Sequence, residues 1–535
     1  MGGESAPGET ARFLGIQQYI NRWEDIMRKG VGYLFTALVC VTIYTLAFTG
    51  AAQAIDLDSE GRYQLGGYLE NITAMRMEDG AKDQSKPGDY LQKKGDLAMM
   101  RNILFMDFNA KLKDDLQFKF IGRGYYEAVW DLDSSIYQPP KDDSTRPGRD
   151  SHKMKSDFEF REFYATYTPG NWTVKAGRMQ VAWGEADAIR IADVINPLDL
   201  SWYWSFPKWE DIRVPLYMVN ASYAVPDSAH NLRFEMVWVP DYMSHQYAAP
   251  GANWDFLTQI GVPIANADAY RDQQGEDLPE RGVNNLQGGV RVKATFWDWD
   301  FTVFGYYGRD HLGVNTLDLS GNALNSNLHP AKWHYPSVFH LGGTFAGFCS
   351  PLDVVFRGEF AYSFGQPFEK LNFDPVVPGG ATWYDYGIGS SDYESKDTFA
   401  YMLGFDYNVM IPALNRTKSF FISGQFFQKY VLNYNEDVKM RTFFGEQDWG
   451  DTWTVASLLI NTEFYEGKIQ PQVLGVHFFD SECGFFDGNI TYKPNYTLSF
   501  TLGYLAIWGN DYNAGLYFGP VQNNDQVYFK VKWTF

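Results

Sequence analysis

The last nine residues of the chain alternate strictly between apolar and polar side chains, and no other feature limits the possible folds as much. The apolar positions are Val527, Phe529, Val531, Trp533 and Phe535. The positions between them hold Tyr528, Lys530, Lys532 and Thr534. Because successive side chains of a β-strand point to opposite faces, the segment predicts a strand with one apolar and one polar face. A wall between lipid and a wet lumen is built from such strands.

The same alternation recurs along most of the chain. Val290 and Val292, for example, stand on either side of Arg291. We count about eighteen such segments against a template of period two. They begin near residues 61, 100, 115, 156, 171, 212, 230, 288, 299, 335, 352, 397, 419, 453, 468, 485, 496 and 525.

The connections between these segments are alternately short and long. The short ones, after even-numbered segments, include 113–115, 169–171, 226–228, 297–298, 349–351, 412–414, 466–467 and 494–495. The long ones include 124–155, 184–211, 239–284, 309–334, 365–396 and 432–452. Bacterial barrels have short periplasmic turns and long outer loops. We therefore predict an all-β fold, a transmembrane antiparallel β-barrel of about eighteen strands, with about sixteen as the alternative because the connection near 481–483 is short for an outer loop.

One apolar stretch, 31–48, is long enough to cross a membrane as a helix. Arg28-Lys29 precede it and Ala52-Gln53-Ala54 follow it. A basic start, an apolar core and small residues before the cut are the three parts of a secretory signal peptide. The residues before Met27 fit this pattern poorly, so we expect the true start at Met27 and cleavage after Ala54.

Residues 1–54 are thus predicted to be a signal region, and residues 55–535 a single outer-membrane β-barrel domain. The charges of the signal region cancel, so the mature chain keeps the net charge of -20, which argues against nucleic acid as a partner. An aromatic content of 17% suits girdles of Trp and Tyr at two lipid interfaces. The expected surroundings are the lipid and lipopolysaccharide of the bacterial outer membrane. The terminal strand that ends on Phe535 resembles the β-signal of such barrels, which implies the barrel assembly machinery as a partner.

The connection from Gly184 to Asp211 is too apolar for a loop that stays in water, because it carries Ile189, Ile191, Val194, Ile195 and Leu198. We expect it to fold into the lumen. Folded inward, it would form a constriction lined by Arg190, Asp193 and Asp199. The alternative is a lid or packing cap without a role in selectivity.

The region around this loop carries a family resemblance. Its motif consists of Gly177, Arg178, Trp183, Gly184, Asp193, Asn196, Pro197 and Arg213. This motif resembles that of large outer-membrane barrels of unknown function, domain of unknown function 1302. The resemblance implies that the protein works beside an inner-membrane or periplasmic transport partner, namely an exporter of the resistance-nodulation-division type. It also implies that the cargo is a lipid or another hydrophobe.

Basic residues fall on predicted inward positions of many strands. They are Lys111, Lys119, Lys175, Arg291, Lys293, Arg357, Lys429, Lys530 and Lys532. A basic wall would lower the cost of an anion in transit. The alternative, which we favour, is that they pair with inward acids: Asp107, Glu159, Glu359 and Asp406. Acidic stretches at 272–280, 385–397, 436–437 and 446–451 are expected to bind divalent cations that bridge lipopolysaccharide, if they have a role.

Three classes of function remain. The first is a diffusion porin, general or anion-preferring. The second is a conduit for amphiphilic or hydrophobic cargo, and the third is a barrel-embedded hydrolase. We rank the hydrolase last, because the motifs of the common hydrolases are missing from the sequence, and we predict no catalytic, cofactor-binding or metal-binding residues.

The two cysteines of the mature chain test the topology. The strand count places Cys349 in a short turn and Cys483 in an outer connection, so an apolar band about 25 Å tall separates them. A disulfide needs Cα atoms within about 7 Å. We therefore predict that the two do not bond and that Cys483 is accessible from outside.

Overall fold

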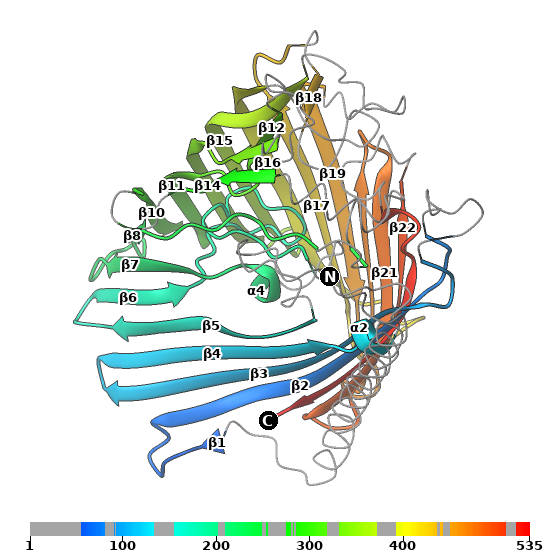
Figure 1. The fold of residues 1–535 in the computed structure, drawn as a ribbon. Helices are drawn as coiled ribbons and strands as arrows, with labels where there is room; N and C mark the ends of the chain where they lie inside the picture. Colours follow the sequence, from blue (N-terminus) through cyan, green and yellow to red (C-terminus); the bar gives the residue numbers. More distant parts are fainter. Residues whose placement is uncertain are drawn as a thin grey trace, which may run out of the picture.

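The computed structural model describes residues 55–80, 90, 92–132, 155–201, 209–248, 253–254, 274–279, 282, 285–317, 331–371, 392–435, 439–441, 450–509 and 521–535. Eighteen strands follow one another around a closed antiparallel ring, in which the last strand pairs with the first (Figure 1). The predicted fold class and strand number are confirmed. The predicted starts fall close to the observed ones, and the largest difference is at β16, which begins at Asp392.

The first nine wall strands are β2 (Tyr63–Arg76), β3 (Leu97–Lys113), β4 (Leu116–Glu127), β5 (Ser156–Tyr167), β6 (Trp172–Met179), β7 (Leu216–Ala224), β8 (Arg233–Val239), β10 (Gln287–Phe296) and β11 (Trp299–Arg309). The other nine are β14 (Ser337–Cys349), β15 (Val354–Leu371), β16 (Asp392–Val409), β17 (Phe420–Val431), β19 (Thr452–Asn461), β20 (Ile469–Phe478), β21 (Cys483–Tyr492), β22 (Leu498–Trp508) and β23 (Gln526–Thr534).

Smaller elements extend the wall or lie in the connections. β1 (Ile55–Asp56) pairs with β2, and β18 (Lys439–Arg441) pairs with β15. β9 (Gln274–Asp277), β12 (Val314–Leu317) and β13 (Ala331–His334) form a separate sheet of three strands. The helices α2 (Val129–Leu132) and α4 (Trp209–Ile212) are single turns. No helix among the described residues is long and apolar enough to cross a membrane.

The connections separate into two ends of the barrel, as the sequence predicts. The short-turn end has 114–115, 168–171, 225–232, 297–298, 350–353, 410–419, 462–468 and 493–497. The long-loop end has 77–96, 128–155, 180–215, 240–286, 310–336, 372–391, 432–451, 479–482 and 509–525. Below, loop 3 is 180–215, loop 4 is 240–286 and loop 5 is 310–336. Loop 3 is the connection that the sequence singles out.

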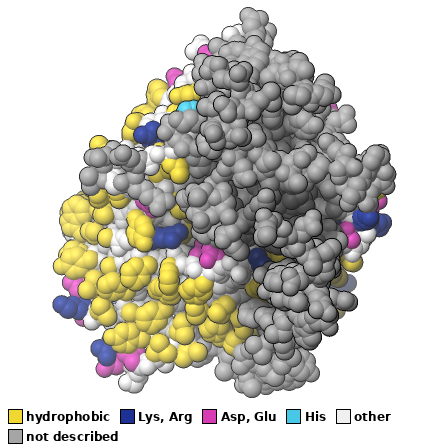
Figure 2. Space-filling model, in the orientation of Figure 1, with side chains coloured by type: hydrophobic (Ala, Val, Ile, Leu, Met, Phe, Trp, Pro, Cys, Tyr) yellow, Lys and Arg dark blue, Asp and Glu magenta, His cyan; other side chains and the backbone are white. Residues whose placement is uncertain are grey.

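The outer face of the wall is apolar and the inner face is polar. On β10, Val290 is 58% exposed on the outside, whereas Arg291 turns inward to pair with Glu235 of β8. Figure 2 shows hydrophobic side chains gathered where Figure 1 places β4 to β8. A lipid bilayer would cover such a surface, and the charges inside would stay hydrated or paired.

The two ends of the barrel sequence meet at one seam. β2 pairs with β23 from Tyr68 and Thr534 to Arg76 and Gln526. Beyond the strand, the backbone N–H and carbonyl of Phe535 bond the carbonyl and N–H of Gly67, both at 3.0 Å. A side chain at Gly67 would strike the backbone of β3, so only glycine fits this close approach.

The cysteines confirm one prediction and correct another. Neither forms a disulfide with the other, since Cys349 ends β14 at the short-turn end and Cys483 begins β21 at the long-loop end. The predicted accessibility of Cys483 is wrong, since its side chain is fully buried. It belongs to the apolar cluster inside the barrel, and its sulfur lies 2.9 Å from the hydroxyl of Ser481.

Candidate functional site

Loop 3 folds into the barrel and packs along one part of the inner wall. The ring of Trp183 contacts Phe304 and Tyr306 of β11, with centroids 5.5 and 6.1 Å apart. Residues of the loop share one core cluster with four wall strands: Ala188, Ile191, Ala192 and Ile195 with Val237, Phe304, Met402 and Phe427. The described part of the loop therefore covers the inner wall from β8 to β17.

A single wall carboxylate, Glu359 of β15, holds the far side of this loop. It accepts hydrogen bonds from the backbone N–H groups of Glu185 at 2.8 Å, Ile191 at 3.2 Å and Ala192 at 3.4 Å. Glu359 is 2% exposed. One side chain therefore fixes two separate points of the loop, at 185 and at 191–192. Glu359 was expected to pair with a wall cation, and it binds the loop backbone instead.

Two more wall residues hold the same part of loop 3. The amide oxygen of Gln425 on β17 accepts from the N–H groups of Asp187 at 3.1 Å and Ala188 at 3.3 Å. Arg357 of β15 pairs with Asp187 at 2.6 Å and with Asp406 of β16 at 2.9 Å. This part of the loop is thus joined to the wall by polar contacts from two strands, β15 and β17.

The family motif builds the loop from within, and Asn196 is its central residue. The fully buried Asn196 accepts from the N–H of Val181 at 2.9 Å and donates to the carbonyl of Val214 at 3.0 Å. The carbonyl of Pro197 accepts from the N–H of Val214 at 2.8 Å. These bonds tie the entry of the loop to its exit, since Val181 follows β6 and Val214 precedes β7.

The three residues predicted to line a constriction, Arg190, Asp193 and Asp199, are bonded within the loop instead. Asp193 pairs with Arg213 at 2.7 Å and with Arg190 at 3.2 Å. Arg190 also donates to the carbonyl of Asn196 at 2.7 Å. Asp193 and Asp199 are buried, and burial raises the pKa of Asp199, whose carboxylate accepts from Ser201. Buried charges need partners, and here the loop supplies them itself.

The remaining motif residues shape the junction between β6 and the loop. Gly177 has a φ of 139°, and a Cβ there would strike the backbone of β5. Arg178 donates to the carbonyl of Pro215 at 3.2 Å. Trp183 donates to Glu235 at 3.2 Å, and Gly184 leaves room for the carboxylate of Glu359. Trp202 and Trp204 lie outside the described residues.

Loops 4 and 5 contact loop 3 through two histidines. The N–H of Leu198 donates to Nδ1 of His245 at 2.7 Å. Nδ1 of His311 lies 2.8 Å from the carbonyl of Met243, and its Nε2 lies 3.1 Å from that of Ile195. Burial lowers the pKa of His311 and places the pKa of His245 well below its usual value. The three loops therefore meet around these two buried imidazoles.

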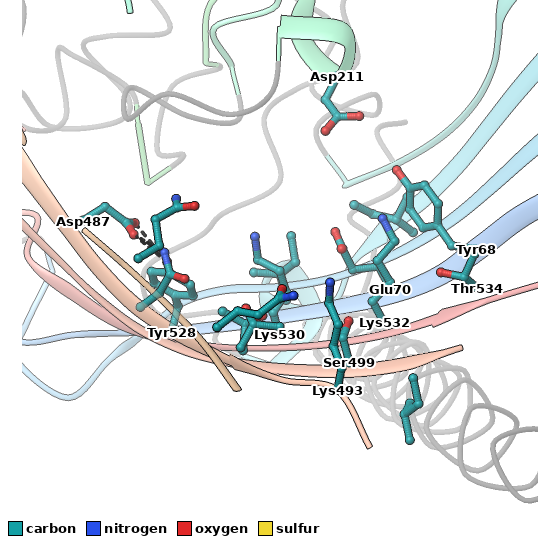
Figure 3. A pocket seen from close by; sticks show the side chains of 18 of the residues that line it. Tyr68, Glu70, Asp211, Asp487, Lys493, Ser499, Tyr528, Lys530, Lys532 and Thr534 are labelled. Carbon is teal, nitrogen blue, oxygen red and sulfur yellow. Dashed lines mark hydrogen bonds between the residues drawn. The ribbon is translucent and has the colours of Figure 1, made fainter. Parts of the chain in front are cut away.

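A cavity of about 1030 Å³ lies along the opposite part of the wall, on β2 to β4 and β20 to β23 (Figure 3). Toward the short-turn end its lining is polar: Glu463, Glu466, Lys468, Lys493, Ser499, Lys532 and Thr534. Most of its apolar lining lies toward the long-loop end: Ile72, Ala74, Met99, Trp254, Phe485 and Leu505. Arg123, Asp211 and Gln526 line that end too, so the cavity becomes more apolar along the barrel axis without losing all its charges.

Lys530 lies between these two parts of the cavity. Its register neighbours are Ile72 on β2 and Thr501 on β22. Figure 3 shows its side chain among the lining residues. Its ammonium lies 5.6 Å from the ring of Tyr528, and no carboxylate in the described part of the chain pairs with it. Lys530 is thus placed to meet an anionic group inside the cavity.

Most residues of the predicted basic wall have partners, but only Lys119 and Arg357 pair with the acids that the alternative named, Asp107 and Asp406. Ion pairs join Lys111 to Asp114, Lys119 to Asp107, Arg291 to Glu235, Lys293 to Asp300 and Arg357 to Asp406. Aromatic rings face Lys175, Lys429 and Lys532, those of Tyr164, Phe368 and Tyr68. Glu159 pairs with Arg123 and Arg161, which were not in the predicted set. The acidic loop stretches lie mostly outside the described residues.

Sequence reasoning missed Gln425, His311 and Arg161. Each is a polar residue that binds the backbone of loop 3. For Gln425 and Arg161 the only available signal was a polar side chain on a strand, and this signal is shared by residues that merely face water. His311 lies in loop 5, where no strand pattern applies. Their role depends on where loop 3 passes, which strand periodicity does not indicate.

A family model described as a protein of unknown function, DUF1302, matches residues 35–535 of the chain. This span includes the motif region and all of the barrel. No curated protein matches the sequence.

Solved structures of other barrels are similar over most of their length. Acinetobacter baumannii OccAB1 has 10% identity and a TM-score of 0.44, covering 91% of this chain and 98% of its own. Pseudomonas aeruginosa OpdK with vanillate has 9% identity and a TM-score of 0.42, covering 88% and 98%. Salmonella typhi OmpF in complex with daunomycin has 10% identity and a TM-score of 0.36, covering 89% and 98%. Resemblance at this level does not indicate what this chain transports.

Proposed function

Because this chain belongs to the DUF1302 family, whose model spans its entire barrel, we propose that it is a transport conduit of the bacterial outer membrane for amphiphilic cargo. The observation that carries the proposal is the cavity opposite loop 3, which is mainly polar toward the short-turn end and has most of its apolar side chains toward the long-loop end. An amphiphile has the same two parts, so its head can stay among charges while its chain displaces water from apolar side chains.

The apolar outer face and the terminal strand support the location. An 18-stranded wall with an apolar exterior needs lipid around it. Because bacterial barrels have short turns on the periplasmic side, the short-turn end would face the periplasm. In this proposal residues 1–54 direct export and are removed, and the barrel assembly machinery reads the strand that ends at Phe535. An inner-membrane or periplasmic partner would deliver the cargo at the short-turn end. Lipopolysaccharide would surround the long-loop end.

An anion-preferring diffusion porin is the second candidate, and Lys530 is the observation that favours it. A lysine without a carboxylate partner among the described residues, facing a wet lumen, lowers the barrier for an anion. The two candidates differ in what limits the flux: a porin passes small ions steadily, whereas a conduit binds its cargo and passes few ions.

The test measures conductance and binding on the same preparation. In planar bilayers we expect a small conductance from the wild-type protein, and a larger one when residues 185–192 are replaced by a Gly-Ser segment of equal length. The same replacement in the exposed turn 225–232 is the control and should change nothing. In parallel, a fluorescent long-chain carboxylate should bind the wild-type protein.

Matched lysine variants locate the binding. Lys530→Gln should weaken binding of the carboxylate by roughly tenfold, the value of one charge-assisted contact. Lys175→Gln should leave binding unchanged, because Lys175 faces inward over Tyr164 outside the cavity. A large steady wild-type conductance together with no carboxylate binding would reject the conduit in favour of the porin.

A further inference from the structure

The barrel wall has a step between β5 and β6. β5 pairs with β4 from Ser156 to Tyr167, but with β6 only from Phe163 to Tyr167. β6 ends at Met179, where the chain turns inward to become loop 3. Among the described residues, 156–162 therefore have no strand beside them on this edge. An open strand edge is not tolerated against lipid, so something else must cover it.

A β-bulge marks the same place. Ile121 of β4 pairs with Glu162 and Gly122 pairs with Phe160, which leaves Arg161 as the extra residue of β5. A bulge bends its strand and redirects one side chain. Arg161 is redirected inward and is buried, where it donates to the carbonyls of Glu210 at 2.8 Å and Arg213 at 2.7 Å.

The segment that covers the step from inside is α4 with the residue after it, 209–213. Besides Arg161, the guanidinium of Arg123 on β4 holds it, donating to the carbonyl of Asp211 at 2.8 Å. Both arginines share the carboxylate of Glu159. Within the described residues, no strand ladder joins α4 to β5 (Figure 1). Side-chain contacts can be exchanged at lower cost than a ladder of backbone bonds.

The outside of the step carries exposed aromatic rings. Phe158 is 48% exposed and Phe160 is 56% exposed, with ring centroids 5.5 Å apart. Two more rings extend the group. The ring centroid of Phe120 lies 5.5 Å from that of Phe160, and the centroid of Phe163 lies 6.5 Å from that of Phe120. The open edge therefore lies beside a lipid-facing apolar patch.

The cavity reaches this place from the other side, because Arg123 and Asp211 belong to its lining. We propose that the step between β5 and β6 is a lateral opening covered by α4, through which the chain of an amphiphile passes between the cavity and the surrounding lipid. This inference rests on the proposed function and adds the route. It requires cargo that dissolves in a membrane, since a polar solute would gain nothing from leaving sideways.

The first test releases α4. Proteoliposomes receive a fluorescent long-chain carboxylate on an albumin carrier, and a quencher attached to lipid reports its arrival in the bilayer. Arg161→Met should raise the protein-dependent transfer rate by roughly tenfold, because the cover loses the two charge-assisted bonds that Arg161 makes to the carbonyls of Glu210 and Arg213. Lys119→Met is the control, since Lys119 pairs with Asp107 away from the step. Ion conductance should not follow the transfer rate.

The second test leaves both arginines in place and remains informative if Arg161→Met does not fold. A photo-crosslinking residue replaces Phe160 beside the step or Phe405 on β16, which is also exposed on the outer face and is paired on both sides. Cargo loaded through the protein should be captured several times more at 160 than at 405. Equal capture would overturn the lateral route. If the wild-type protein still bound the carboxylate, the proposed conduit would survive and its exit would lie elsewhere.

Discussion

Glu359 shows how much of the lumen depends on one side chain. Its carboxylate accepts three backbone hydrogen bonds from two points of loop 3. We predict that Glu359→Gln weakens the docking of the loop by about 2 kcal/mol, because the amide nitrogen of Gln cannot accept and leaves a buried backbone N–H of the loop without an acceptor. Faster cleavage within loop 3 by a protease added to the folded barrel would measure this. Asp107→Asn is the control, since Asp107 binds Lys119 and not the loop.

At the scale of single residues, the sequence did not indicate what surrounds each side chain. It singled out Arg190, Asp193 and Asp199 as residues lining a constriction, whereas Asp193 pairs with Arg190 and Arg213 inside the loop and Asp199 is buried. Linear spacing shows that charges lie near each other along the chain. It does not show whether water or protein surrounds them, and that depends on the wall opposite.

Loops 3, 4 and 5 act as one element because His245 and His311 join them. Burial lowers the pKa of both imidazoles below that of a free histidine, about 6.5. Arg190 lowers the pKa of both further, and Asp310 opposes this at His311. Because the folded-state pKa is lowered, docking of the loops is fully stable above about pH 6.5, the pKa of a free histidine. It weakens as the pH falls below that value.

We therefore predict that protease cleavage within loop 3 and ion conductance both rise as the pH falls from about 6.5, the pKa of a free histidine, to about 5. Conductance of single barrels at several pH values would measure the change. The double variant His245→Gln with His311→Gln should flatten the profile. A profile equally steep in that variant would assign the effect to other groups.

Among the elements, the strands were predictable and the course of the loops was not. Period two appears in any strand that separates lipid from a lumen, so β10 or β23 can be read from a few residues. The inward fold of loop 3 could be expected from its apolar content. Its docking on β15 and β17, and the stop of β6 at Met179, depend on contacts across the barrel that sequence neighbours do not encode.

At the scale of the whole molecule, the seam between β2 and β23 decides whether the ring closes. Removing Phe535 deletes both backbone bonds to Gly67 and shortens the last apolar face. We predict that this truncation reduces the fraction of chain assembled in membranes several-fold, while barrels that do form melt close to the wild type. Heat-modifiable mobility in gels would measure the folded fraction. Thr534→Ala is the control, because it keeps the terminal aromatic residue.

The seam also imposes an order in time. It joins Tyr68 to Thr534, almost the full length of the barrel sequence apart, whereas most other neighbours in the wall are consecutive strands. Contacts between distant residues form slowly, because a long chain must first be brought together. Until β23 arrives, the growing sheet has two unpaired edges, which invite aggregation. The last step of folding is therefore the pairing of β23 with β2, which removes both edges at once. A chain that has not yet reached this step needs a chaperone to keep its edges from aggregating.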